Sequence, residues 1–116
     1  MTQKDEAAAI AESLMAKTAD KELTWSDSFE SDEYSAQTAR FLYYIKSRDE
    51  DGQPPYRLQV MLKGGDSASV VLEVMSNSDD AALGVAFRGL YEAAKRSYLG
   101  LTDSIANEVL RDLGDL

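Results

Sequence analysis

Three segments with the two-residue period of β-strands follow one another in the middle of the chain, and only short turns separate them. The segments are 38–46, 56–63 and 70–75, and their β-branched and aromatic residues favour an extended backbone. The connections at 48–55 and 64–67 contain the Gly, Pro and acidic residues typical of turns. This order predicts an antiparallel meander. A fourth strand is expected at 23–29, where Leu23, Trp25 and Phe29 alternate with Ser and Thr.

Segments with helical periodicity flank the strands. Residues 4–18 place Ala7, Ile10, Ala11 and Leu14 on one helical face. A longer helix follows the capping residues 76–80 and ends at Gly100. Thr102 or Asp103 then caps a shorter helix with the apolar residues Ile105, Val109 and Leu113. We therefore expect one α+β domain over residues 1–116, with an N-terminal helix, an antiparallel sheet of three to four strands and two C-terminal helices packed on the sheet.

The chain contains neither Cys nor His. This composition excludes disulfides, thiolate nucleophiles, Cys-ligated metals and every catalytic arrangement that needs an imidazole. The turn Asp49–Gly52 resembles part of a calcium loop, but Leu58 stands where the closing glutamate is required. No pair of carboxylates is placed for acid–base work. We therefore expect a non-enzymatic protein with no cofactor and no metal.

The formal net charge of -9 is unevenly distributed. Residues 1–35 carry nine acids and three bases (-6), residues 36–75 carry five of each (0), and residues 76–116 carry seven acids and four bases (-3). The acidic balance argues against direct binding to nucleic acid or to an anionic membrane, since both require clustered Lys and Arg. The first residues lack the continuous apolar region of a secretory signal, so we expect a cytoplasmic location.

The second face of the predicted sheet carries more apolar side chains than a solvated face should. If the strands alternate regularly, this face contains Leu42, Tyr44, Met61, Val71 and Met75. Two explanations remain open. The N-terminal helix covers the face through Ile10 and Leu14, or the face is exposed and binds a partner protein or a second copy of the chain. These five residues form the predicted protein-binding site, which would also serve a homodimer.

The N-terminal third offers a second candidate surface. Six acids occur in the fourteen residues from Asp20 to Glu33. Such a surface keeps a protein soluble without any partner, but it also suggests an acidic inhibitor that mimics nucleic acid and blocks a basic groove. The residues assigned to this acidic surface are Asp20, Glu22, Glu30, Asp32 and Glu33.

Two short motifs resemble a pattern found in small uncharacterised prokaryotic proteins. Residues 21–25 read K-E-L-T-W, which is similar to a K-x-L-x-W segment, and residues 90–100 read L-Y-E-A-A-K-R-S-Y-L-G, which is similar to an L-Y-x-x-A-x-R-x-x-L-G helix–Gly–helix ending. The resemblance implies a stand-alone bacterial or phage-encoded module without a catalytic residue. It suggests an accessory, adaptor or immunity-type partner of another protein, in a conflict or antiviral defence system.

Overall fold

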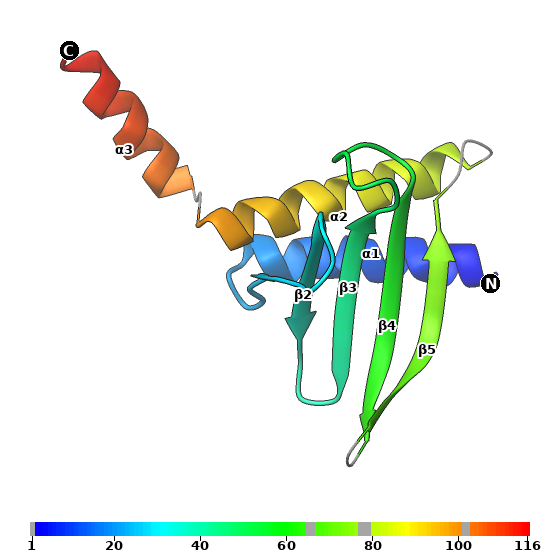
Figure 1. The fold of residues 1–116 in the computed structure, drawn as a ribbon. Helices are drawn as coiled ribbons and strands as arrows, with labels where there is room; N and C mark the ends of the chain where they lie inside the picture. The colour runs from blue at the N-terminus through cyan, green and yellow to red at the C-terminus, as the bar shows by residue number, and fades with distance from the viewer. Residues whose placement is uncertain (1, 65–66, 77–79, 101–102) are drawn as a thin grey trace.

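The computed structural model describes residues 2–64, 67–76, 80–100 and 103–116. Its elements in chain order are α1 (Gln3–Ala19), β1 (Ser26–Asp27), β2 (Glu33–Gln37), β3 (Phe41–Ser47), β4 (Tyr56–Gly64), β5 (Ser67–Met75), α2 (Ala81–Leu99) and α3 (Asp103–Gly114). The five strands form one antiparallel sheet in the order β1-β2-β3-β4-β5 (Figure 1). The α+β class and the order of elements are as predicted, and the sheet has five strands where three to four were expected.

The additional strand is β2, which the sequence pattern does not predict. Its residues Glu33–Gln37 include Glu and Ala, which are depleted in strands, and a single aromatic residue, Tyr34. It becomes a strand because each of its residues pairs with one of β3, from Glu33 opposite Lys46 to Gln37 opposite Leu42. The strand expected at 23–29 is limited to the two residues of β1, because only Ser26 and Asp27 pair with β2.

Both long helices lie on the same face of the sheet, side by side (Figure 1). The buried residues of α1 are Ala7, Ala11 and Leu14, and they belong to the same core cluster as Leu58 of the sheet and Phe87 of α2. Small residues bring the helices close together: a Cβ at Gly89 of α2 would lie 2.7 Å from the Met15 Sδ of α1. The N-terminal helix therefore does not cover the second face of the sheet, and the first of the two explanations above is wrong.

Both long helices have capped ends, at Thr2 for α1 and at Asp80 and Gly100 for α2. Thr2 accepts a hydrogen bond from the backbone N–H of Asp5, whose carboxylate accepts one from the Thr2 N–H, so α1 begins with a capping box. Asp80 caps α2, while residues 77–79 of the expected capping segment lie outside the described residues. Gly100 ends α2 with a φ of 74°, a left-handed conformation that favours glycine.

Helix α3 differs from the prediction that both C-terminal helices pack on the sheet. It projects from the end of α2 away from the body of the molecule (Figure 1), and every side chain from 107 to 116 is exposed. The radius of gyration is 15.3 Å, whereas a compact domain of this length has about 13 Å. The proposed cap Thr102 lies outside the described residues. Among the described helices, none is both long enough and apolar enough to cross a membrane.

Candidate functional site

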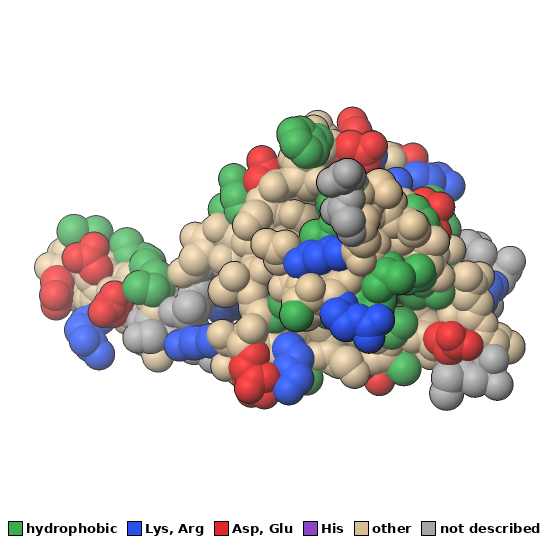
Figure 2. Space-filling model, turned by 90° about the horizontal axis from the view of Figure 1, so that it is seen from below, with side chains coloured by type: hydrophobic (Ala, Val, Ile, Leu, Met, Phe, Trp, Pro, Cys, Tyr) green, Lys and Arg blue, Asp and Glu red, His purple; other side chains and the backbone are tan. Residues whose placement is uncertain are grey.

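An apolar groove runs along α1 on the helix-covered side of the sheet. It has a volume of about 720 Å³. One wall is the face of α1 that carries Glu6, Ile10, Ser13 and Lys17 at helical spacing. The sheet contributes Phe41, Tyr43, Val60, Val71 and Leu72, and the lining is completed by Glu22 and Leu23, which follow α1, and by Thr38 between β2 and β3. Figure 2 views the molecule from below and shows hydrophobic side chains gathered on this underside, with Lys and Arg side chains near them.

The groove exists because the strands are longer than two helices are wide. The nine residues of β4 span about 30 Å at 3.3 Å per residue. Two helices packed side by side across the strands cover about 20 Å, since each is about 10 Å wide. An uncovered strip about 10 Å wide, the width of one further helix, is left next to α1. Ile10, Phe41 and Tyr43 at this strip remain only partly buried.

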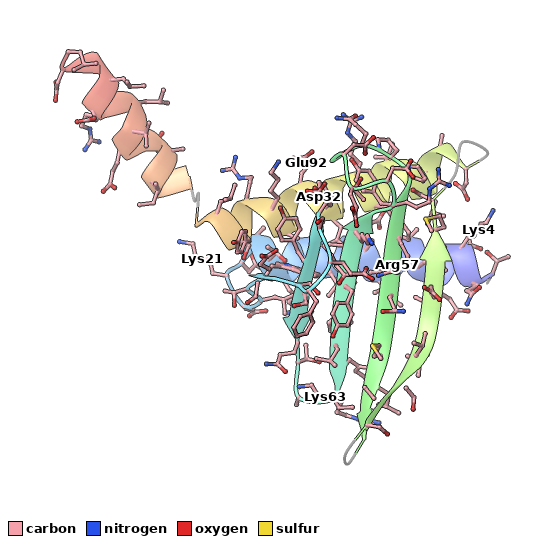
Figure 3. All side chains as sticks on the ribbon, viewed as in Figure 1. Lys4, Lys21, Asp32, Arg57, Lys63 and Glu92 are labelled. Atoms are coloured by element: carbon pink, nitrogen blue, oxygen red, sulfur yellow. The ribbon has the colours of Figure 1, made fainter. Side chains whose placement is uncertain are left out.

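Charged groups border the groove at two places. Lys17 forms an ion pair with Glu22 at 2.8 Å, and the hydrogen bond to that carboxylate raises the pKa of Lys17. At the open end of the sheet, the guanidinium of Arg40 lies 5.6 Å from the centre of the Phe41 ring. The Lys63 Nζ donates a hydrogen bond of 2.6 Å to the backbone oxygen of Thr38, and Figure 3 labels Lys63 at this lower end. Neither Arg40 nor Lys63 lines the groove itself, whose charged lining residues are Glu6, Lys17 and Glu22.

The second face of the sheet is less apolar than the sequence suggests. The register places its side chains in rows that cross the strands. Nearest the open end, Lys63 pairs with Ala68. The next row is apolar from β3 to β5, with Leu42, Met61 and Val70, and continues to Gln37 on β2. The row after it contains Ser35, Tyr44, Gln59 and Glu73, and the last contains Glu33, Lys46, Arg57 and Met75. Leu42 and Met61 thus lie together as predicted, Tyr44 lies one row away, and Met75 lies beside Arg57.

Val71 does not join this face, which corrects the predicted alternation. Val60 pairs with Leu72, but the next residue, Met61, pairs with Val70, so β5 carries one extra residue at this point. This β-bulge takes Val71 out of the outer row and places it at the groove, while Val70 takes its place opposite Met61. A regular two-residue period cannot reveal such an insertion.

The acidic residues do not form one continuous surface. Glu33 is buried, with 4% of its surface exposed, and so is removed from the predicted acidic surface. Its carboxylate accepts hydrogen bonds from the Ser28 hydroxyl and from Arg57. Glu30 accepts a hydrogen bond of 2.9 Å from Lys46, which lowers the pKa of that carboxyl group. Asp20, the C-cap of α1, and Asp32 complete the predicted set, with Asp32 labelled near the opposite end of the sheet from the groove (Figure 3).

Three buried tyrosines form a cluster beneath α2. The Tyr91 ring stacks on that of Tyr56 at 4.9 Å and lies 5.6 Å from that of Tyr34. The Tyr56 hydroxyl donates a hydrogen bond to the backbone oxygen of Gly52. Burial raises the pKa of all three phenols, so they are protonated at neutral pH. Their position in the core indicates packing of the 48–55 loop onto α2.

A smaller hollow of about 330 Å³ lies at the β1–β2 edge of the sheet. Its lining is mainly polar and includes Thr24, Ser26, Ser35 and Gln37. Among the described residues, no group of three or more acidic side chains is placed to hold a metal ion. The α1–sheet groove is therefore the larger and more apolar of the two hollows.

No family model matches the chain, and no curated protein or solved structure matches it.

The groove has no signature in the periodicity of the sequence. The sequence predicts Ile10 on the apolar face of the N-terminal helix and Val71 on the second face of the sheet, and both line the groove. The available signal was strand length: nine-residue strands are too long for two helices to cover. The position of α1 across the strands was also needed, and periodicity does not contain it.

Proposed function

We propose that this chain is a small, non-enzymatic protein-binding module of the accessory or adaptor kind, and that it holds an amphipathic helix of a partner protein in the α1–sheet groove. The observation that carries the proposal is the uncovered strip of sheet beside α1, which is apolar and about one helix wide. Helix-in-groove binding uses such a surface, with side chains at helical spacing as anchors.

The dimensions of the groove support a short helix as the ligand. Its wall on α1 extends from Glu6 to Lys17, which corresponds to about 17 Å at 1.5 Å per residue. A helix of about 12 residues has the same length. The floor offers Phe41 and Tyr43 as aromatic contacts, and Ile10 and Val71 form the sides. Aromatic side chains are enriched at protein interfaces, and Tyr is enriched among the residues that contribute most of the binding energy.

The second face of the sheet supports the proposal less well. Its apolar row contains Leu42, Met61 and Val70, and the adjoining row contains Gln59 and Glu73. This is a common pattern for the solvated side of an antiparallel sheet. We therefore move the proposed contact from the outer face, where the sequence placed it, to the groove.

Two neighbouring valines provide a matched test. Val70 and Val71 are 50% and 52% exposed, but Val70 lies in the outer row while Val71 lines the groove. The probe is a synthetic fluorescein-labelled amphipathic helix of about 14 residues with Leu at helical spacing and a Gln-rich polar face; a peptide of the same composition in scrambled order is the control. Binding is measured by fluorescence anisotropy, and circular dichroism checks the fold of each variant.

The wild-type chain should bind the amphipathic peptide in preference to the scrambled one. Val71→Glu should weaken binding at least about tenfold, because a buried carboxylate would face the apolar side of the peptide. Val70→Glu should leave the affinity within about twofold. Equal binding of the two peptides would contradict the proposal, and a loss seen only with Val70→Glu would return the site to the outer face.

The acidic nucleic-acid mimic is the alternative with less structural support. A mimic needs carboxylates that project in a row like phosphates, whereas Glu33 is buried and Glu22 and Glu30 are paired with lysines. Its binding to a basic protein should weaken steeply as salt increases, while binding in an apolar groove should change little.

A further inference from the structure

Helix α3 is an amphipathic helix whose apolar side is exposed. Val109, Leu110 and Leu113 are 49%, 66% and 56% exposed, and Leu116 at the end of the chain is 99% exposed. The opposite side of the helix carries Asn107, Glu108, Arg111, Asp112 and Asp115. An isolated helix of 12 residues is marginally stable in water, and an amphipathic one gains its stability by packing its apolar face.

The chain therefore carries both a groove for one helix and a helix with an exposed apolar face. The lengths agree: α3 has 12 residues, or about 18 Å, and the α1 wall of the groove is about 17 Å long. The match is one of length and apolar surface, since the charged residues that line the groove are Glu6, Lys17 and Glu22.

The helix cannot easily reach the groove of its own chain. The groove is lined by α1 and the sheet, and no residue of α2 lines it, because α1 lies between α2 and the groove (Figure 1). A connection from α2 to α3 would have to cross α1, which is about 10 Å wide, and then reach the centre of the groove. Residues 100–102 connect the two helices, and three residues span at most about 11 Å.

We propose that α3 of one copy docks in the α1–sheet groove of a second copy, and that the second copy returns its own α3 in the same way. Such an exchange is closed and two-fold symmetric, so it fills both grooves and covers both helices. The inference rests on the groove being a helix-binding site, as proposed above, and names a second copy of this chain as an occupant. Another partner would then have to displace α3.

The buried area is sufficient for a dimer. The exposed fractions of Val109, Leu110, Leu113 and Leu116 correspond to on the order of 300 Å² of apolar surface on each helix. Each groove loses a somewhat smaller area, so two exchanged helices bury on the order of 1,000 Å², about the minimum for a biological interface. We therefore expect a dimer that dissociates on dilution.

Analytical ultracentrifugation of the full chain tests the dimer over a concentration range of about 100-fold. The wild type should shift from monomer to dimer as concentration rises. Leu113→Glu on the exposed apolar side of α3 and Val71→Glu in the groove should each weaken dimerisation at least about tenfold. Asn107→Glu on the polar side of α3 and Val70→Glu on the outer face of β5 are the matched controls, and both should dimerise like the wild type.

Cross-linking identifies which segments meet, and the absence of native cysteines makes it specific. A chain with Leu113→Cys and a chain with Val71→Cys are mixed and treated with a short bismaleimide. A cross-linked dimer of the two chains is expected, and Val70→Cys in place of Val71→Cys should give much less. In a chain that carries both Leu113→Cys and Val71→Cys, exchange gives cross-linked dimers, whereas docking within one chain gives a cross-linked monomer.

Each other outcome overturns the inference. A wild-type monomer at every concentration, a dimer that survives Leu113→Glu, or a cross-linked monomer would each show that α3 is not exchanged between copies. The exchange of α3 and the proposed helix-binding function can fail separately. If the synthetic helix binds the groove but α3 does not, the proposed function stands and the exchange is wrong. If α3 is exchanged but no synthetic helix binds, the groove serves self-association alone.

Discussion

Replacing Arg57 by Met should destabilise the protein strongly, although Arg57 lies on the outer face of the sheet. The side chain is 20% exposed and binds the carboxylate of Glu33, whose side chain is only 6% exposed. Glu30 and Glu73 lie 3.6 Å and 3.9 Å from Arg57. In Arg57→Met, the buried Glu33 carboxylate would retain a hydrogen bond from Ser28 but lose its counter-charge.

The expected magnitude follows from the burial of this ion pair. Removing one partner of a buried pair costs about 3–5 kcal/mol, and the partial exposure of Arg57 favours the lower end, about 3 kcal/mol. The unfolding entropy is about 2.1 cal/mol/K per residue, or about 0.24 kcal/mol/K for 116 residues. The melting temperature should therefore fall by about 12 °C.

Thermal and urea unfolding, followed by far-ultraviolet circular dichroism and by the fluorescence of Trp25, measure the change. Arg48→Met is the matched control, because Arg48 is 55% exposed and pairs with Asp49 in a turn; it should change the free energy of unfolding by less than about 0.5 kcal/mol. The double variant Glu33→Gln with Arg57→Met should be at least about 1 kcal/mol more stable than Arg57→Met alone, since no buried charge remains. Equal effects of Arg57→Met and Arg48→Met would refute the argument, as would a double variant less stable than Arg57→Met.

Three further predictions concern the core and the helices. Burial raises the pKa of Tyr91 above that of an unfolded tyrosine, about 10, so the unfolded state ionises first and the free energy of unfolding should fall above about pH 10. The urea midpoint of Tyr91→Phe should fall less with pH than that of the wild type. The same pH dependence of the midpoint in both proteins would contradict this. Gly84→Ala should raise the free energy of unfolding by about 0.5–1 kcal/mol, because nothing lies within 4 Å of the new Cβ in the helix. Gly100→Ala should lower it by about 1 kcal/mol, because Gly100 has a positive φ. Thermal unfolding should therefore show a raised melting temperature for the first variant and a lowered one for the second. Ser76→Ala should cost about 1–3 kcal/mol, because the buried backbone N–H of Tyr56 donates to the Ser76 hydroxyl; faster hydrogen exchange at Tyr56 would accompany the loss, and an unchanged urea midpoint would exclude it.

Much of the architecture follows from local chemistry that the sequence displays. The Ala-rich composition of residues 4–18 favours the N-terminal helix, and the end of α2 follows from Gly100 in a left-handed conformation. Strands β3 and β4 were located closely because their residues alternate regularly: Phe41, Tyr43 and Ile45 face the core side, and Leu42 and Tyr44 face away. These features depend on residues near one another in the chain.

The candidate site depended on contacts that local patterns do not contain. Pairing with β3 makes a strand of Glu33–Gln37 and buries Glu33 against Arg57. The extra residue in β5 exchanges the faces of Val70 and Val71. The position of α1 beside α2 leaves one helix width of sheet uncovered. Composition and periodicity thus determined the order of elements and the acidic, Cys- and His-free chemistry, because each residue carries these by itself. Tertiary structure decided the groove, because strand register and helix placement are set by which distant surfaces pack together.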